Sequence, residues 1–237
     1  MLARWELLAT PDLAINRDEC LCLLFNIDAI SQSSIERWLS RIMPSEQDAA
    51  ENFAKPNDRK RFVATRFLLR KYLKLVFGQE PIIEENEYGK PFLVNQDGQF
   101  NVSHSGDFLL MAFSYIPIGV DIEKIVKFSE MKYIKDNLYH PGERDEINNV
   151  QMNQSDLWFF ICWTRKEALL KAIGKGLTIK TESFQVSCDP NKADLHHSPD
   201  PYNQWRILNT PPIDENYVSS LCIGGTLKTI KFRSVNI

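Results

Sequence analysis

The sequence contains no CxxC pair, although cysteine is present at positions 20, 22, 162, 188 and 222. An odd number of cysteines without metal-ligand spacing predicts neither a disulfide framework nor a structural zinc site. A reducing compartment suits such a chain, so we expect a cytoplasmic protein. Long apolar runs are also missing. The stretch CLCLLFNI, residues 20–27, is far too short to span a membrane and predicts a buried strand instead.

A basic excess is missing too, because the formal net charge is −3. This argues against nucleic-acid binding through bulk charge. The chain also lacks low-complexity tracts. What remains is ordinary for a soluble globular protein: 43% hydrophobic and 25% charged residues over 237 positions. That length supports one large domain or two small ones with a real core.

The hydrophobic pattern alternates between strand and helix character along the whole chain. We expect helices at 34–41, 56–78 and 155–174, with Asn57 or Asp58 as the N-cap of the second, and a helical region at 129–150 broken at 140–142. We expect strands at 20–30, at 99–114 as a pair around a tight SHSG turn, at 116–125, and as short segments within 178–237. The class is therefore α/β (α+β). The order predicts two similar α/β halves, residues 1–117 and 118–237, that meet near 116–119.

The segment GVDIEKI, residues 119–125, places Asp121 and Glu123 two positions apart in a β-branched run. Both side chains leave the same face of a strand. At about 6 Å two carboxylates repel by about 3 kcal/mol at an effective dielectric constant of 20, and a bound cation removes that cost. Hard oxygen ligands favour Mg²⁺. The alternative is a pair of exposed acids on a sheet edge.

Glu167 and Lys171 share a face of the helix predicted at 155–174 because they are four residues apart. Such a pair is usually a surface salt bridge. Two features favour a functional role. The surrounding helix is aromatic and apolar, and the segment Gly174-Lys175-Gly176 that follows leaves room for a ligand to approach the backbone.

Other polar side chains suit phosphate binding. Ser103 and His104 lie in SHSG, and Lys90 follows Gly89. Arg61 belongs to a basic face of the helix predicted at 56–78. For each of them, a side chain that is merely solvated is the competing interpretation.

Taken together, four segments resemble the surfactin-synthetase-activating (Sfp) type of 4′-phosphopantetheinyl transferase. They are YGKPF at 88–92, FNVSHSG at 100–106, GVDIEK at 119–124 and WTRKEALLKAIGKGL at 163–177. The resemblance covers roughly residues 50–190, and Trp163 with Ala168 is similar to the subgroup that has a W…KEA signature.

The resemblance implies two α/β halves related by a pseudo-twofold axis, with a ligand cleft between them, in a monomer that binds neither nucleic acid nor membrane. It implies transfer of 4′-phosphopantetheine from coenzyme A to a serine of an acyl or peptidyl carrier protein, with release of adenosine 3′,5′-bisphosphate. Asp121, Glu123 and Glu167 would hold one Mg²⁺ at the junction of the halves as a preformed site.

The remaining roles also follow from the resemblance. Glu167 would be the general base, with a metal-bound water as the alternative, and Lys171 would reach the phosphates. The coenzyme A contacts would be Arg61, Lys90, Ser103, His104 and Lys171, with His104 on the 3′-phosphate. Two other functions stay open: a carrier-protein-binding module without catalysis, and another Mg²⁺-dependent nucleotide pyrophosphatase.

Overall fold

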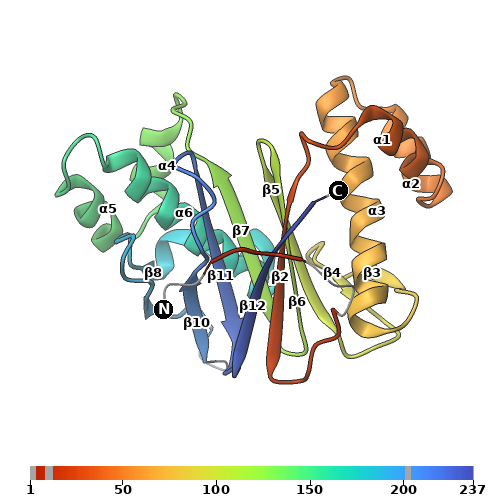
Figure 1. Cartoon of the computed structure of the whole chain (residues 1–237). Coiled ribbons are helices and arrows are strands. Elements are labelled where there is room, and N and C mark those ends of the chain that lie inside the picture. Colours follow the sequence, from red (N-terminus) through yellow and green to blue (C-terminus); the bar gives the residue numbers. More distant parts are fainter. Residues whose placement is uncertain (1–3, 9–12, 201–203, 237) are drawn as a thin grey trace.

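A computed structural model describes residues 4–8, 13–200 and 204–236. Two β-sheets lie side by side, with helices α1–α3 on the outer face of one and α4–α6 on the outer face of the other (Figure 1). Three apolar clusters fill the spaces: one under each helical layer and one between the sheets. The mixed α/β class and the two halves predicted from the sequence are confirmed.

The first half consists of a five-stranded sheet and its helices. The strands lie in the order β1 (Glu6–Leu7), β12 (Thr229–Val235), β2 (Glu19–Asn26), β6 (Phe108–Ser114) and β5 (Gln99–Ser105). The helices are α1 (Gln32–Leu39), α2 (Pro44–Glu51) and α3 (Pro56–Phe77). The last strand of the chain, β12, runs parallel to both β1 and β2. The division at 117/118 stays a prediction, and β12 returns from the second half to the first sheet.

The second half consists of a three-stranded sheet in the order β10 (Trp205–Asn209), β11 (Tyr217–Gly224) and β7 (Ile118–Lys124). Its helices are α4 (Met131–Leu138), α5 (Pro141–Asn148) and α6 (Ser155–Ile173). Two small hairpins complete the described strands: β3 (Ile83–Glu85) with β4 (Pro91–Leu93), and β8 (Gln185–Val186) with β9 (Leu195–His197). No helix in the described ranges is both long and apolar enough to cross a membrane.

The ends of the two long helices follow from local chemistry. Both end at a glycine in the left-handed region, Gly78 with φ of 80° and Gly174 with φ of 76°. The predicted N-cap of α3, Asn57 or Asp58, is wrong. The helix starts at Pro56 with Lys55 as its N-cap, because proline lacks the N–H that the first turn leaves unpaired.

The predicted SHSG turn is also wrong in part. Ser103, His104 and Ser105 end strand β5, and the turn consists of Gly106 and Asp107. Gly106 has φ of 53°, a conformation that glycine adopts without steric cost, so the chain reverses there. Ser103 and His104 therefore lie on a strand, with their side chains on opposite faces.

The two sheets are joined along their edge strands β5 and β7 by side chains instead of a backbone ladder. We call this contact the seam. Its bonds run from the N–H groups of Val120, Ile122 and Lys124 to side-chain oxygens of Asn101, Ser103 and Ser105, at 2.8, 3.3 and 3.0 Å respectively. Alternate N–H groups of β7 point at β5, so side chains at alternate positions of β5 satisfy them.

Candidate active site

One face of β7 lies directly under α6. Gly119, Asp121 and Glu123 occupy that face, whereas Val120 and Ile122 point into the core between the sheets. A Cβ atom on Gly119 would lie 2.1 Å from the Ala168 carbonyl oxygen and 2.4 Å from the backbone nitrogen of Ala172. Glycine at this position therefore lets the helix rest on the strand and brings its side chains beside the two acids.

Asp121 is the most buried of the three acids Asp121, Glu123 and Glu167, with 2% of its surface exposed. Its Oδ1 accepts hydrogen bonds from Ser103 Oγ at 2.7 Å and from Lys171 Nζ at 2.6 Å. Its Oδ2 is buried and has no partner among the described residues. Burial raises the pKa of Asp121, and Lys171 opposes that rise. The alternative of an exposed acid on a sheet edge is wrong for this residue.

Glu123 and Glu167 stand beside Asp121 from two different elements. Ser105 Oγ donates to Glu123 Oε2 at 2.8 Å. Burial raises the pKa of Glu123, and the charge of Asp121 raises it further. The pKa of Glu167 is raised by burial first and then by Asp121. The charge of Asp121 thus raises the pKa values of both glutamates, which marks this place as one where positive charge is favoured.

A cleft of about 850 Å³ opens over these residues, between α3 and β5 on one side and β7 and α6 on the other. The structure brings to it all but one of the side chains singled out from the sequence: Arg61, Ser103, His104, Asp121, Glu123, Glu167 and Lys171. The predicted ligand cleft between the halves therefore exists.

The cations of the cleft differ in how they are held. Arg61 Nη1 lies 3.4 Å from Asp58 Oδ1, one turn back on α3. His104 is exposed at the edge of the cleft. Protein atoms that replace part of the water around the imidazole lower its pKa, and the positive charge of Arg61 lowers it further. Lys171 does not form the surface pair with Glu167 that was the competing interpretation of the helical spacing; it bonds to Asp121 on β7.

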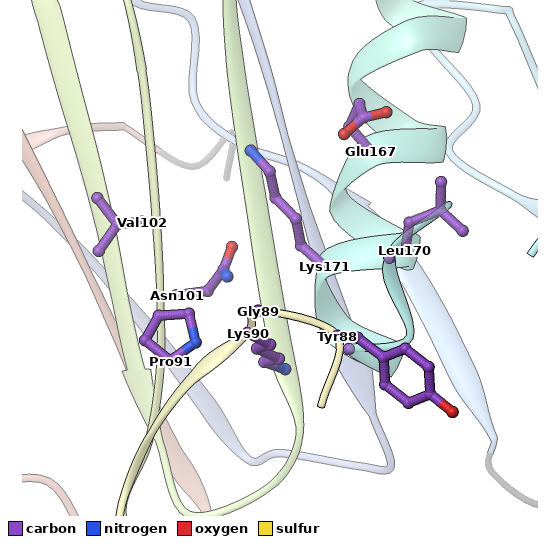
Figure 2. A pocket seen from close by; sticks show the side chains of 11 residues that line it. Tyr88, Gly89, Lys90, Pro91, Asn101, Val102, Glu167, Leu170 and Lys171 are labelled. Atoms are coloured by element: carbon purple, nitrogen blue, oxygen red, sulfur yellow. The ribbon is translucent and has the colours of Figure 1, made fainter. Parts of the chain in front are cut away.

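Lys90 lies in an adjoining cavity of about 300 Å³ that shares Glu167 and Lys171 with the cleft. Figure 2 shows Tyr88, Gly89 and Lys90 on the loop before β4, below these two residues of α6. Lys90 Nζ donates to the carbonyl oxygen of Ala172 at 2.9 Å, and burial lowers the pKa of Lys90 to about 8. The ammonium group thus binds the C-terminal end of α6, where the helix dipole favours a cation.

The acids of the cleft supply oxygen ligands of the kind that a divalent cation binds. No three His, Cys, Asp or Glu side chains within the described ranges already form a metal-ligand group, so the expected preformed site is not there. Lys171 covers one oxygen of Asp121 instead. The donor set nevertheless fits. The buried Oδ2 of Asp121 lacks a partner, and Glu123 and Glu167 add carboxylates, which are the ligands Mg²⁺ prefers.

Two contributors to the site were missed in the sequence. Asn101 and Ser105 were not singled out, yet each accepts a backbone N–H of β7, and Ser105 also orients Glu123. Trp163, noted only as part of the motif, lines the cleft and lowers the pKa of Glu123. The signal was present as N-x-S-x-S at 101–105, polar residues on one face of a strand.

Comparison with known families agrees with this arrangement. Residues 29–115 match the N-terminal part of 4′-phosphopantetheinyl transferase, and residues 117–222 match the 4′-phosphopantetheinyl transferase superfamily. The 4′-phosphopantetheinyl transferase gsp of Aneurinibacillus migulanus is 32% identical over 77% of this chain and 76% of its own. The chain belongs to the 4′-phosphopantetheinyl transferases of the Sfp type.

Two further relatives extend the comparison of this transferase. The 4′-phosphopantetheinyl transferase HetI of Nostoc sp. is 30% identical over 95% of this chain and 96% of its own. The 4′-phosphopantetheinyl transferase Sfp of Bacillus subtilis is 28% identical over 81% of this chain and 87% of its own. The similarity to HetI spans both halves of the chain, so the transferase assignment covers the residues on both sides of the cleft.

Proposed function

We propose that this transferase moves the 4′-phosphopantetheine group from coenzyme A to a serine of an acyl or peptidyl carrier protein, with Mg²⁺ as cofactor. Adenosine 3′,5′-bisphosphate is the second product. The enzyme acts as a cytoplasmic monomer whose partners are coenzyme A and the carrier protein.

The observation that carries this proposal is the division of charge across the cleft. Arg61 and Lys171 supply cationic groups, His104 supplies an imidazole, and Asp121, Glu123 and Glu167 supply carboxylates, around one space of about 850 Å³. A nucleotide with several phosphates needs the cations directly, and it meets the carboxylates through a shared metal ion. The volume lies in the range of small-molecule and cofactor sites.

Asp121, Glu123 and Glu167 are the residues that would hold Mg²⁺. When bound, the ion neutralises charge on the pyrophosphate oxygens as the leaving group departs. Burial of these acids supports this role. Burial raises the pKa values of all three acids, and the charge of Asp121 raises those of Glu123 and Glu167 further, so a cation is favoured there.

The transfer itself makes one P–O bond and breaks another. The carrier serine oxygen attacks the phosphorus that bears the pantetheine chain, and the bond from that phosphorus to the bridging oxygen breaks. Glu167 lines the cleft, from where its carboxylate would accept the serine proton. Lys171 lies beside Asp121, where its ammonium group stabilises the negative charge on the departing bisphosphate.

Mass spectrometry of a carrier protein incubated with coenzyme A, Mg²⁺ and this enzyme tests the proposal. We expect a mass gain of one phosphopantetheine group on the serine, and none with Glu167→Gln, because one carboxylate charge and the base are lost. A carrier that stays unmodified while coenzyme A is hydrolysed would show a pyrophosphatase instead. An unmodified carrier that binds the enzyme would show a docking module without catalysis.

A further inference from the structure

The residue before Glu167 on α6 is a lysine that the proposed chemistry does not use. The side chain of Lys166 is 1% exposed and does not line the cleft. Its partner is Glu143 on α5, whose side chain is 0% exposed. A fully buried ion pair beside the predicted base therefore needs an explanation of its own.

Several hydrogen bonds hold the pair. Lys166 Nζ lies 2.6 Å from Glu143 Oε1 and 2.9 Å from the carbonyl oxygen of Phe184. Glu143 accepts two backbone N–H groups, from Val186 to Oε1 at 2.8 Å and from His140 to Oε2 at 2.8 Å. One charge on α6 is thus fixed to the start of α5 and to the strand β8.

Stability alone does not account for this arrangement. Replacing a buried ion pair by apolar residues of similar volume is often neutral or stabilising, because two charges must be taken out of water. Removing only one partner is strongly destabilising. A buried pair of this kind is better explained by what it orients. Its directional bonds fix the rotation of α6 about its own axis, which apolar contacts specify less sharply.

Rotation of α6 matters because Glu167 is the next residue. Successive residues lie about 100° apart around a helix, so fixing the direction of Lys166 also fixes the direction of Glu167. A carboxylate about 6 Å from the axis moves by about 1 Å when the helix turns by about 10°. A misplacement of about 1 Å can cost about a hundredfold in rate.

The neighbouring residue Arg165 also restrains the rotation of α6. The Arg165 side chain is buried, and its Nη1 donates to the Ser187 carbonyl oxygen at 2.6 Å. Its Nη2 donates to Asn209 Oδ1 at 2.8 Å. Arg165 ties α6 to the segment after β8 and to the end of β10, whereas Lys166 ties it to α5. The strand side of the helix is fixed separately by Gly119.

We propose that the buried Lys166–Glu143 pair positions Glu167 for proton transfer by setting the rotation of α6. Lys166 and Glu143 act through Glu167 and touch no substrate, so they are positioning residues. The proposal rests on the proposed function, because it assigns a cause to the orientation of the base.

The test compares single and paired replacements. Lys166→Met and Glu143→Leu each leave a buried charge unpaired, so each should lower the melting temperature. The double variant removes both charges, and its melting temperature should return to within a few degrees of the wild type. If the pair positions Glu167, kcat of the double variant stays at least about tenfold below the wild type, while KM for coenzyme A is unchanged.

The variant Arg17→Ala with Asp97→Ala removes an ion pair whose side chains are 75% and 73% exposed, and it should leave both quantities unchanged. If the apolar pair does not fold, Lys166→Gln with Glu143→Gln keeps polar groups at both positions and takes its place. A stable double variant with wild-type kcat, or one that changes only KM, would overturn the proposal. The wild type, assayed alongside, reports on the proposed function independently, since only its own failure to transfer would reject that function.

Discussion

Nζ of Lys171 on α6 lies 2.6 Å from Oδ1 of Asp121 on β7. The aspartate side chain is 3% exposed and the lysine side chain 28%. The lysine thus neutralises a buried carboxylate and also faces the cleft, where phosphates are proposed to bind. The folded site and the proposed chemistry therefore depend on the same ammonium group.

Lys171→Met should reduce kcat by about a hundredfold or more, because one preorganised charge at the reaction centre is lost. The melting temperature should also fall, since Asp121 loses its partner in a buried setting. Carrier modification and thermal unfolding measure the two effects. The exposed Lys175, four residues on, provides the control as Lys175→Met, which should match the wild type in both assays. Transfer by Lys171→Met within tenfold of the wild type would remove Lys171 from the reaction.

Coenzyme A and Mg²⁺ together should raise the melting temperature by more than the sum of their separate effects. If Asp121, Glu123 and Glu167 hold the ion as proposed, phosphate oxygens of the nucleotide would supply further ligands, so each ligand would strengthen the binding of the other. Differential scanning fluorimetry with each ligand alone and with both provides the comparison. Additive shifts would show two separate sites.

His104→Ala should weaken coenzyme A by about ten- to a hundredfold and 3′-dephospho-coenzyme A hardly at all. A charge-assisted bond to phosphate is worth about 1.5–3 kcal/mol, and the dephosphorylated analogue lacks the partner. The pKa of His104 is lowered, so the imidazole is less often charged near pH 7. The difference should therefore grow as the pH falls and shrink above neutrality. Titration calorimetry of both nucleotides measures it, and equal losses for the two would move the 3′-phosphate to Arg61.

Gly119→Ala should lower stability by about 1–3 kcal/mol and transfer by more than tenfold. Its new methyl group meets the backbone of Ala168 and Ala172, so α6 must shift away from Asp121. Gly142→Ala is the matched control. Its methyl group would meet the end of the Gln185 side chain, which can turn aside. Urea unfolding and carrier modification separate the two variants, and a Gly119→Ala enzyme with wild-type values would mean that α6 is not held where the strand places it.

Much of this fold is readable from the sequence because local signals agree. The apolar spacing of 56–78, with Gly78 after its last turn, predicts α3 to within a residue or two. The run at 155–174 predicts α6 in the same way. The return of β12 beside β2 was not predicted, since the pairing of strands 210 residues apart in the chain leaves no local signal.

In the candidate site, too, some features can be predicted from the sequence and others cannot. Asp121 and Glu167 stand out because acids inside apolar segments are unusual, and the cleft does contain both. The partner of Lys171 could not be read from helical spacing, which pairs it with Glu167; the structure pairs it with Asp121 because α6 rests on β7. The Lys166–Glu143 pair depends on how α5 meets α6, a tertiary contact that spacing does not encode.

The seam couples any movement of the two halves to the orientation of the acids in the cleft. Ser103 accepts the Ile122 N–H and also donates to Asp121, and Ser105 accepts the Lys124 N–H and also donates to Glu123. The hydroxyl groups that hold the sheets together are therefore the ones that aim the carboxylates. Any hinge-like opening of the cleft along this line would turn both acids away at once, so substrate entry and catalytic alignment cannot be tuned independently.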